Sequence, residues 1–389
     1  MKNTIGPPVS GDDFAGRRKN LNKAIRLLNN HNSFLILGIR RTGKSSFLQQ
    51  VAYLLKQEDK KNICIELDCQ TFETTLDFYK GLYSAMPKSL QIRFKKLLND
   101  SKQIPTKMVD YLTDNLKSIS LLGNKIELHD KLMTYHKPFE SIVNRFFKSE
   151  QEKVFLFLDE LPFFFENIEE SSKKVDEIVH ILTGLRSWRN TGLAMGITGS
   201  LNLSVQLEQL GISKKLLAGL NTIKLESFSR EESFDFIERL SLSDSYSQWS
   251  ADITNKLLDL LPDYIPYFLQ YSYNEIAVNE CKTPQEIEYV FHNDIMSGLF
   301  RDFLYQFQER LRIFKGDDLN IAMKILDNIA LDENLNLDDL QNKLKSKFDY
   351  EILVKLMDNE FISEDQYYHF GLNIIKNWWI NKRGLNHKK

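Results

Sequence analysis

Residues 35–48 read LILGIRRTGKSSFL, an apolar run followed by a short loop with two glycines and then a lysine–serine pair. From Gly38 to Ser45 the stretch fits the phosphate-binding pattern G-x-x-x-x-G-K-[ST] at each fixed position. Glycines let successive backbone N–H groups turn toward a phosphate, Lys44 can bridge the β- and γ-phosphates, and Ser45 can ligate Mg²⁺. A helix that begins near Gly43 adds the favourable end of its dipole. The stretch therefore predicts a nucleotide site on a strand–loop–helix unit.

Five short apolar runs indicate the strands of one sheet: FLIL (34–37), ICIEL (63–67), VFLFL (154–158), LAMGIT (193–198) and TIKL (222–225). Helical patterns lie between them. Strands that alternate with helices are typical of an α/β protein whose parallel sheet is covered on both faces. The second and third runs are separated by far more chain than one crossover needs, so residues 87–136 are predicted to be a helical insertion.

After residue 226 the pattern becomes helical. Ser229 precedes Glu232 by three positions, which is the capping-box signature of a helix start. The C-terminal part outlines a winged helix, with three helical stretches, a β-like segment and a final helix; the first four are at 319–331, 337–346, 349–359 and 361–370. We therefore expect a core at 1–226, a helical lid at 227–312 and a winged-helix domain at 313–389.

The composition is that of a globular protein. With 42% hydrophobic residues, 27% charged residues and a net charge of −2, it gives no global sign of nucleic acid or an anionic membrane as a partner. The three cysteines show no metal-ligand spacing and fit a reducing compartment. No apolar run reaches the ~18–20 residues of a membrane span, and the N-terminus lacks the apolar core of a signal peptide. We expect a cytoplasmic protein.

A second motif closes the third apolar run. The stretch VFLFLDELPFF (154–164) carries Asp159 and Glu160 where the strand should end. An acid at the carboxyl end of a strand beside a phosphate loop can hold Mg²⁺ through its water shell, and the next acid can polarise the attacking water. On their own, the two residues would equally suit a helix N-cap with a first-turn acid. With the loop, they predict a hydrolytic site in which Glu160 and Lys44 are catalytic and Ser45 and Asp159 bind the metal.

The chain resembles the archaeal-type P-loop ATPases, a family of the STAND and AAA+ lineage that is also common in bacteria. The resemblance rests on the two motifs above and on weaker ones in the family's order: FAGR (14–17), LRSWRN (185–190), ITGS (197–200), YIPYFLQ (264–270) and YYHFGLNIIKNWW (367–379). It covers about residues 12–383. It implies a P-loop NTPase core with a parallel sheet, a helical lid subdomain, a C-terminal winged-helix domain, and the cofactors ATP and Mg²⁺.

The resemblance also implies which residues surround the nucleotide. It places Phe14 and Arg17 beside the adenine, Thr198 and Ser200 in the region that reads the γ-phosphate, and Pro266 in the lid near the nucleotide. Thr198 and Ser200 would equally suit a capped strand end, and Pro266 a plain helix start. The remaining predicted nucleotide ligands are those of the loop: Gly38, Arg41, Thr42, Gly43, Lys44, Ser45 and Ser46.

The arginines leave alternatives open. Arg41 and its neighbour Arg40 suit phosphate contacts and an outward, domain-docking role equally well. Arg186 and Arg189 suit either an arginine finger directed at a neighbouring molecule or the solvated face of a helix. The sequence shows no clear sensor-2 arginine, so the expected oligomeric state stays open.

The predicted function is an ATPase switch that relays its nucleotide state to a protein partner, and the resemblance admits a setting in bacterial defence or signalling. The alternative is an ATP-regulated DNA-binding protein of the origin-binding or transposition-regulator type. The helix that would enter a DNA groove, 349–360, carries four acids and one lysine, which would face phosphates that repel them. We therefore expect a protein partner or a self-oligomer rather than DNA. A third hypothesis is a scaffold that holds nucleotide without hydrolysis. The presence of Lys44, Asp159 and Glu160 together argues against it, because each is costly to keep in place without a use.

Overall fold

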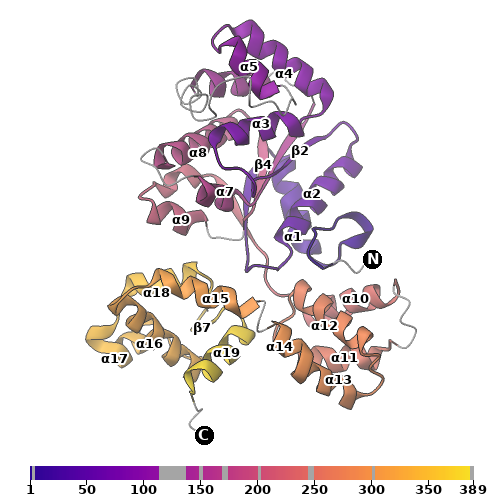
Figure 1. Ribbon diagram of the computed structural model, residues 1–389, viewed down its shortest axis with the longest axis vertical. Helices are drawn as coiled ribbons and strands as arrows, with labels where there is room; N and C mark the ends of the chain where they lie inside the picture. Colours follow the sequence, from indigo (N-terminus) through magenta and orange to yellow (C-terminus); the bar gives the residue numbers. More distant parts are fainter. Residues whose placement is uncertain are drawn as a thin grey trace. The chain divides into compact units, whose positions relative to one another are not determined.

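The computed structural model describes residues 1, 5–113, 137–148, 152–168, 174–199, 203–243, 249–299 and 303–385. The chain divides into two compact units, Pro8–Leu225 and Glu226–Lys389, and Met1–Pro7 is grouped with the second. We call them the α/β unit and the helical unit (Figure 1). The sequence-based boundaries, which place the core at 1–226, the lid at 227–312 and the winged helix at 313–389, stay predictions.

A five-stranded parallel sheet lies at the centre of the α/β unit, with the strand order β2-β3-β4-β1-β5. The strands are β1 (Ser33–Leu37), β2 (Ile63–Asp68), β3 (Val154–Asp159), β4 (Ala194–Ile197) and β5 (Leu220–Lys224). Each predicted apolar run forms one of them, so the expected parallel α/β sheet is confirmed. Because parallel strands all end at the same edge, the loops after β1, β3 and β4 share that edge.

The side chains of each strand alternate between two hydrophobic cores, one on each face of the sheet. On β1, Phe34 and Ile36 face one core and Leu35 faces the other. The first core is completed by α1 (Arg18–Asn29) and α2 (Lys44–Glu58). The helices of the second core cover the opposite face (Figure 1), and they include α3 (Thr75–Ala85), α7 (Leu161–Asn167), α8 (Lys174–Asn190) and α9 (Leu203–Gln209).

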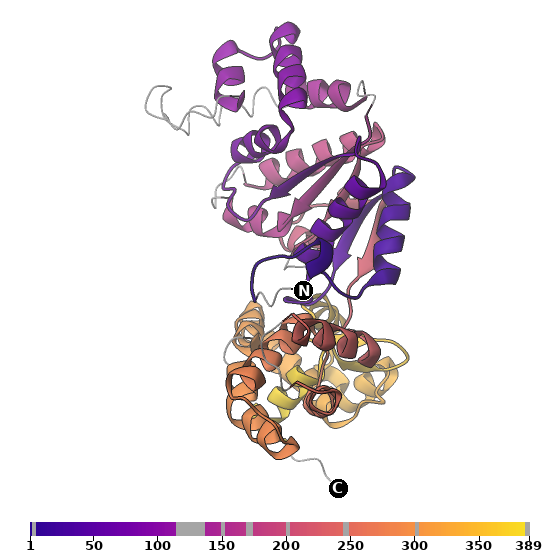
Figure 2. The ribbon, with the colours of Figure 1, turned by 90° about the vertical axis from the view of Figure 1, so that its right-hand side faces the viewer.

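The insertion between β2 and β3 is helical where the structure describes it. It contains α4 (Lys88–Ser101) and α5 (Thr106–Thr113), which lie beyond α3 at the end of the α/β unit away from α1 (Figure 2). Phe94 of α4 is buried and packs against Phe146, with ring centroids 5.0 Å apart, so a helix over residues 137–148 anchors the insertion. The rest of the predicted insertion, residues 114–136, lies outside the described residues.

The helical unit begins with a set of short helices. They are α10 (Arg230–Ser241), α11 (Ala251–Leu260), α12 (Pro266–Val278), α13 (Pro284–Val290), a π-helical turn (Phe291–Ile295), α14 (Met296–Leu299) and α15 (Tyr305–Arg310). The predicted capping box is present at α10: Ser229 and Glu232 each accept a hydrogen bond from the other's backbone N–H. In the part of the chain that the structure describes, no helix has the length and apolar character needed to cross a membrane.

The C-terminal part of the helical unit is a winged helix, as predicted. Three helices lead to an antiparallel hairpin and a last helix: α16 (Asp317–Leu331), α17 (Leu337–Leu344), α18 (Tyr350–Asp358), β6 (Ile362–Glu364), β7 (Tyr368–Phe370) and α19 (Asn373–Arg383). Trp378 and Trp379 of α19 are buried, and the Nε1 of Trp379 donates to Asp327 of α16 at 2.9 Å. Trp379 therefore ties α19 to α16.

Candidate functional site

The loop after β1 is shaped by its two fixed glycines. A Cβ on Gly38 would lie 2.7 Å from the carbonyl oxygen of Leu225, so only glycine fits this close approach. Gly43 adopts φ 86°, a left-handed conformation that favours glycine, and it is the N-cap of α2. No side chain caps α2 from this position, so the N–H groups of its first turn face the loop in the way a phosphate needs.

Lys44 extends back across this loop. Its side chain is buried, and its Nζ donates to the carbonyl oxygens of Gly38 at 2.5 Å and Ile39 at 3.2 Å. Thr42 closes the same turn, since its Oγ1 donates to Ile39 at 2.7 Å. The loop thus holds a cation inside a ring of backbone groups, next to an uncapped helix N-terminus. Both features attract an anion.

Asp159 meets this loop from β3. Its carboxylate accepts a hydrogen bond from the side chain of Ser45, while its Oδ1 is buried and has no hydrogen-bond partner among the described residues. Burial raises the pKa of Asp159 from 3.8 to about 6; the Ser45 hydrogen bond lowers it, and the neighbouring Glu160 adds to the rise. The fold therefore brings together the two predicted metal ligands, and one carboxylate oxygen is left for a cation.

Glu160 and Thr198 flank Asp159 at the same edge of the sheet. Glu160 is the N-cap of α7 at φ 54° and ψ 36°, a left-handed conformation that costs a non-glycine residue about 1 kcal/mol or more. Thr198 follows β4 and is fully buried; its Oγ1 has no hydrogen-bond partner among the described residues. Strain and an unpaired buried hydroxyl at one strand edge are features of a ligand site.

No protein-family model and no curated protein sequence matches this chain. Its structure is similar to a Walker-type ATPase of Pyrococcus abyssi, at 20% identity and a TM-score of 0.58, covering 97% of this chain and 99% of that one. It is also similar to the ORC2 protein of Aeropyrum pernix solved as ADPNP–ADP complexes, at 9% identity and a TM-score of 0.52, covering 99% and 98% of the two chains. The chain has the fold of a Walker-type P-loop ATPase.

The donor groups of this P-loop fold suit ATP with Mg²⁺. The Lys44 ammonium group within the loop and the uncapped start of α2 suit a polyphosphate. The hydroxyl of Ser45 and the Oδ1 of Asp159, which has no partner among the described residues, suit a hard divalent cation. Mg²⁺ is usually held by one or two protein oxygens together with waters and phosphate oxygens. The residues present therefore fit both groups.

An N-terminal segment, residues 9–17, which we call the strap, ties the predicted adenine-side residues to α2, the helix that follows the phosphate loop. The Val9 N–H donates to the Oγ of Ser46 at 3.2 Å, and the Gly11 N–H donates to Gln50 at 2.6 Å. Arg17 is buried at φ 63°, and its guanidinium donates to the carbonyl oxygen of Thr42 at 3.4 Å. Phe14 is half-buried against the core of α1 and α2. The Ser46 hydroxyl thus accepts a hydrogen bond from the backbone of the strap.

The other predicted nucleotide residues lie as follows. Arg41 is half-buried at φ 70° and Arg40 is exposed. Ser200 lies outside the described residues. Pro266 is the first residue of α12 in the helical unit, whereas the loop belongs to the α/β unit. Its contact with nucleotide stays a prediction.

Arg186 and Arg189 bind carbonyl groups of their own chain. The guanidinium of Arg186 donates to Lys215 at 3.3 Å, and that of Arg189 donates to Leu216 and Ala218, both at 3.2 Å. Burial lowers the pKa of Arg189, and the nearby Arg186 adds to this effect. Both arginines hold the turn after α9 in place, which is a local role that neither sequence-based alternative included.

The sequence interpretation missed two neighbours of the site. Asp68 ends β2 directly opposite Asp159 in the parallel register, and the Cys69 N–H donates to the carbonyl oxygen of Asp159 at 2.9 Å. The signal was available, because Asp68 is an acid that directly follows the apolar run 63–67, as Asp159 follows 154–158. Only the pairing of β2 with β3 shows that the two acids share one edge.

Proposed function

We propose that this chain binds ATP with Mg²⁺, hydrolyses it, and uses the cycle as a conformational switch that a protein partner reads. One observation carries the proposal: Ser45 of the phosphate loop hydrogen-bonds to Asp159 of β3, whose Oδ1 is buried and has no hydrogen-bond partner among the described residues. This contact brings together the phosphate loop and the acid pair after β3, the two motifs that a P-loop ATPase needs. The defence or signalling setting stays a prediction, because no described residue bears on it.

The residues of the site divide the chemistry between them. Lys44 and the N–H groups that open α2 bind and orient the phosphates, and Ser45 with Asp159 holds the cation. Bound Mg²⁺ would neutralise charge that develops on the phosphate oxygens. Glu160 follows the metal ligand at the end of β3, and we propose that its carboxylate orients and polarises the attacking water. Thr198 would offer its buried hydroxyl to the γ-phosphate.

The test is steady-state ATP hydrolysis by the wild type and the Glu160→Gln variant. We expect Glu160→Gln to lose about 100-fold or more of the rate and to keep nucleotide affinity, because the amide is nearly isosteric but is a poor base. Glu58→Gln is the matched control, since it removes an exposed carboxylate at the end of α2 opposite the phosphate loop, where it accepts a hydrogen bond from Asn29 at 3.1 Å, and should keep the wild-type rate. Equal rates for the wild type and Glu160→Gln, both above background, would remove Glu160 from the mechanism.

A second candidate function, ATP-regulated DNA binding, is favoured by the winged helix. The acids of the α18 region weigh less against it than their number indicates. Asp349 is the N-cap of α18 and accepts a hydrogen bond from the Glu351 N–H at 2.8 Å, while Glu360 pairs with Arg310 at 3.2 Å. Two of the four acids thus have structural partners. Hydrolysis that duplex or single-stranded DNA stimulates would support this function, whereas a DNA-independent rate with a nucleotide-dependent mass in light scattering would support the protein-partnered switch.

A further inference from the structure

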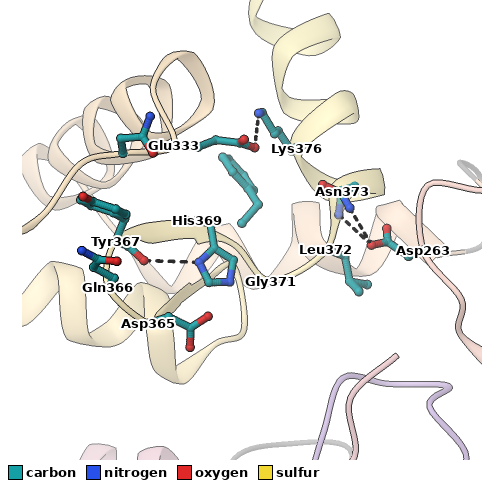
Figure 3. Close-up of a pocket in the computed structure, with 12 residues that line it drawn as sticks. Asp263, Glu333, Asp365, Gln366, Tyr367, His369, Gly371, Leu372, Asn373 and Lys376 are labelled. Carbon is teal, nitrogen blue, oxygen red and sulfur yellow. Dashed lines mark hydrogen bonds and ion pairs between the residues drawn. The ribbon is translucent and has the colours of Figure 1, made fainter. Parts of the chain in front are cut away.

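The loop between α11 and α12 carries a buried carboxylate whose partners lie about a hundred residues further along the chain. Asp263 is 8% exposed. Its Oδ1 accepts hydrogen bonds from the N–H of Asn373 at 3.0 Å and from that residue's side-chain Nδ2 at 3.3 Å (Figure 3). Its Oδ2 accepts a hydrogen bond from the N–H of Ile374 at 2.8 Å. Both carboxylate oxygens are therefore committed to the first turn of α19.

This contact completes a helix start that α19 does not complete itself. Its N-cap residue is Leu372, which provides no side-chain hydrogen bond, whereas α17 and α18 are capped by their own Asn336 and Asp349. The first N–H groups of a helix need acceptors, and a carboxylate there also gains from the helix dipole. Burial raises the pKa of Asp263, while its hydrogen bonds to Ile374 and Asn373 lower it. The last helix of the winged domain is thus held from the α11–α12 loop.

The same loop is tied to the segment that follows β5. The N–H of Phe228 donates to the carbonyl oxygen of Tyr264, next to Asp263, at 2.8 Å. Three residues before Phe228, the Leu225 N–H donates to Leu37 at 2.8 Å, and the Leu225 carbonyl oxygen is the atom that Gly38 approaches. Only two residues, Glu226 and Ser227, therefore separate a contact of the phosphate loop from a contact of the α11–α12 loop.

We infer that Asp263 is a positioning residue that transmits the state of the phosphate loop to the winged-helix domain, through Leu225, Phe228 and the first turn of α19. This inference rests on the proposed function, because it names the route by which the nucleotide state would be relayed. A shift of the β1–β5 edge would reach Phe228 along the chain, because Leu225 is hydrogen-bonded to Leu37 and lies three positions before Phe228. Since Asp263 holds two backbone N–H groups, α19 follows the α11–α12 loop rather than moving independently of it.

The test is hydrogen exchange of the full-length chain, followed by mass spectrometry without nucleotide, with ADP and Mg²⁺, and with a non-hydrolysable ATP analogue and Mg²⁺. Wild type is compared with Asp263→Ala and with Asp349→Ala, a matched control that removes a carboxylate cap from α18 of the same helical unit. Without nucleotide, Asp263→Ala should speed exchange at the start of α19 about tenfold or more, because hydrogen bonds to a charged group are lost. Asp349→Ala should do so in α18 instead.

With nucleotide, the wild type should show an exchange difference between ADP and the ATP analogue in α19. Asp263→Ala should bind both nucleotides with wild-type affinity and lose this difference, whereas Asp349→Ala should keep it. A full α19 response in Asp263→Ala, or a wild type that binds nucleotide without an α19 response, overturns the inference and leaves the proposed function standing. A wild type that binds no nucleotide ends both, although the nucleotide-free exchange still reports the cap. If Asp263→Ala does not fold, Asp263→Asn takes its place, with the charge removed and one acceptor oxygen kept.

Discussion

Two helix N-termini of this protein meet the same electrostatic demand in different ways. Both α2 and α19 begin at a residue that gives no side-chain cap, Gly43 in one case and Leu372 in the other. At α19 the acceptor is built in, since Asp263 fills the first turn. At α2 a glycine loop and Lys44 surround the N–H groups instead, which leaves the place of the anion to a ligand.

The two helix starts also differ in how their residues are distributed along the sequence. The phosphate loop lies in eight consecutive residues, so its pattern is visible in the sequence. The cap of α19 joins residues about 110 apart, and no spacing rule connects them. A contiguous motif therefore indicates ligand binding here, whereas a dispersed contact indicates how parts of the protein are held together. The following measurements can break or sharpen this contrast.

The largest effect is expected at Lys44. Lys44→Ala should weaken ATP binding about 100- to 1000-fold, which corresponds to about 3–4 kcal/mol, because the loop loses the ammonium group held by the carbonyl oxygens of Gly38 and Ile39. Isothermal titration calorimetry measures this. Lys56→Ala is the control on the same helix, since Lys56 is exposed and pairs with Glu66 at 2.7 Å. Unchanged ATP affinity in Lys44→Ala would contradict the assignment of the start of α2 as the place of a ligand anion.

A pH-dependent effect is expected at Asp159. Its pKa in the folded protein is about 6 against an ordinary 3.8, so the folded state binds the extra proton more readily than the unfolded state. This contribution favours folding below about pH 4 and is lost as the pH rises through 6. In the absence of Mg²⁺, Asp159→Asn should therefore be more stable than the wild type by up to about 3 kcal/mol at pH 8, and by almost nothing at pH 3.5.

Urea denaturation at the two pH values measures the difference. Adding Mg²⁺ and nucleotide at pH 8 should reverse the order, because the cation would favour the ionised carboxylate of the wild type. A difference that does not depend on pH would show that burial does not raise the pKa of Asp159.

A smaller loss is expected from a close backbone approach next to the site. A Cβ on Gly199 would lie 2.3 Å from the ring of Pro162 in α7, so Gly199→Ala should cost about 2 kcal/mol and displace the segment after Glu160. Gly184→Ala is the control: its Cβ would meet nothing closer than 3.8 Å within α8, and it should stabilise the fold by about 0.5–1 kcal/mol. Thermal denaturation compares the two. Equal melting temperatures would contradict the described packing of α7 on this loop.

The smallest effect is expected in the winged domain. Trp379→Phe removes the hydrogen bond to Asp327 while keeping most of the buried ring, so it should cost about 1 kcal/mol in stability. The ATP hydrolysis rate should stay within about twofold of the wild type, because the change leaves Asp263 and the start of α19 intact. A large fall in hydrolysis would mean that the interior of α19, and not only its first turn, is coupled to the phosphate loop.

Much of the α/β unit could be predicted because its signals are local. Apolar runs of four to six residues gave all five strands, and the loop pattern marked Lys44 and Ser45 without any knowledge of the fold. The roles of Arg186 and Arg189 could not be predicted in the same way. The sequence pattern around a helical arginine is the same whether the side chain faces water, a neighbouring molecule, or carbonyl groups about 30 residues away.

By itself, the sequence determined that a parallel sheet carries a phosphate loop, that an acid pair follows the third strand, and that a winged helix ends the chain. These features follow from periodicity and from chemistry within a few residues. Only the tertiary structure decided that Ser45 meets Asp159, that Asp68 stands opposite it, and that Asp263 completes α19. Such pairings depend on strand order, which brings residues distant in the sequence to one place. They also depend on burial, because a buried polar group that stays unpaired costs free energy.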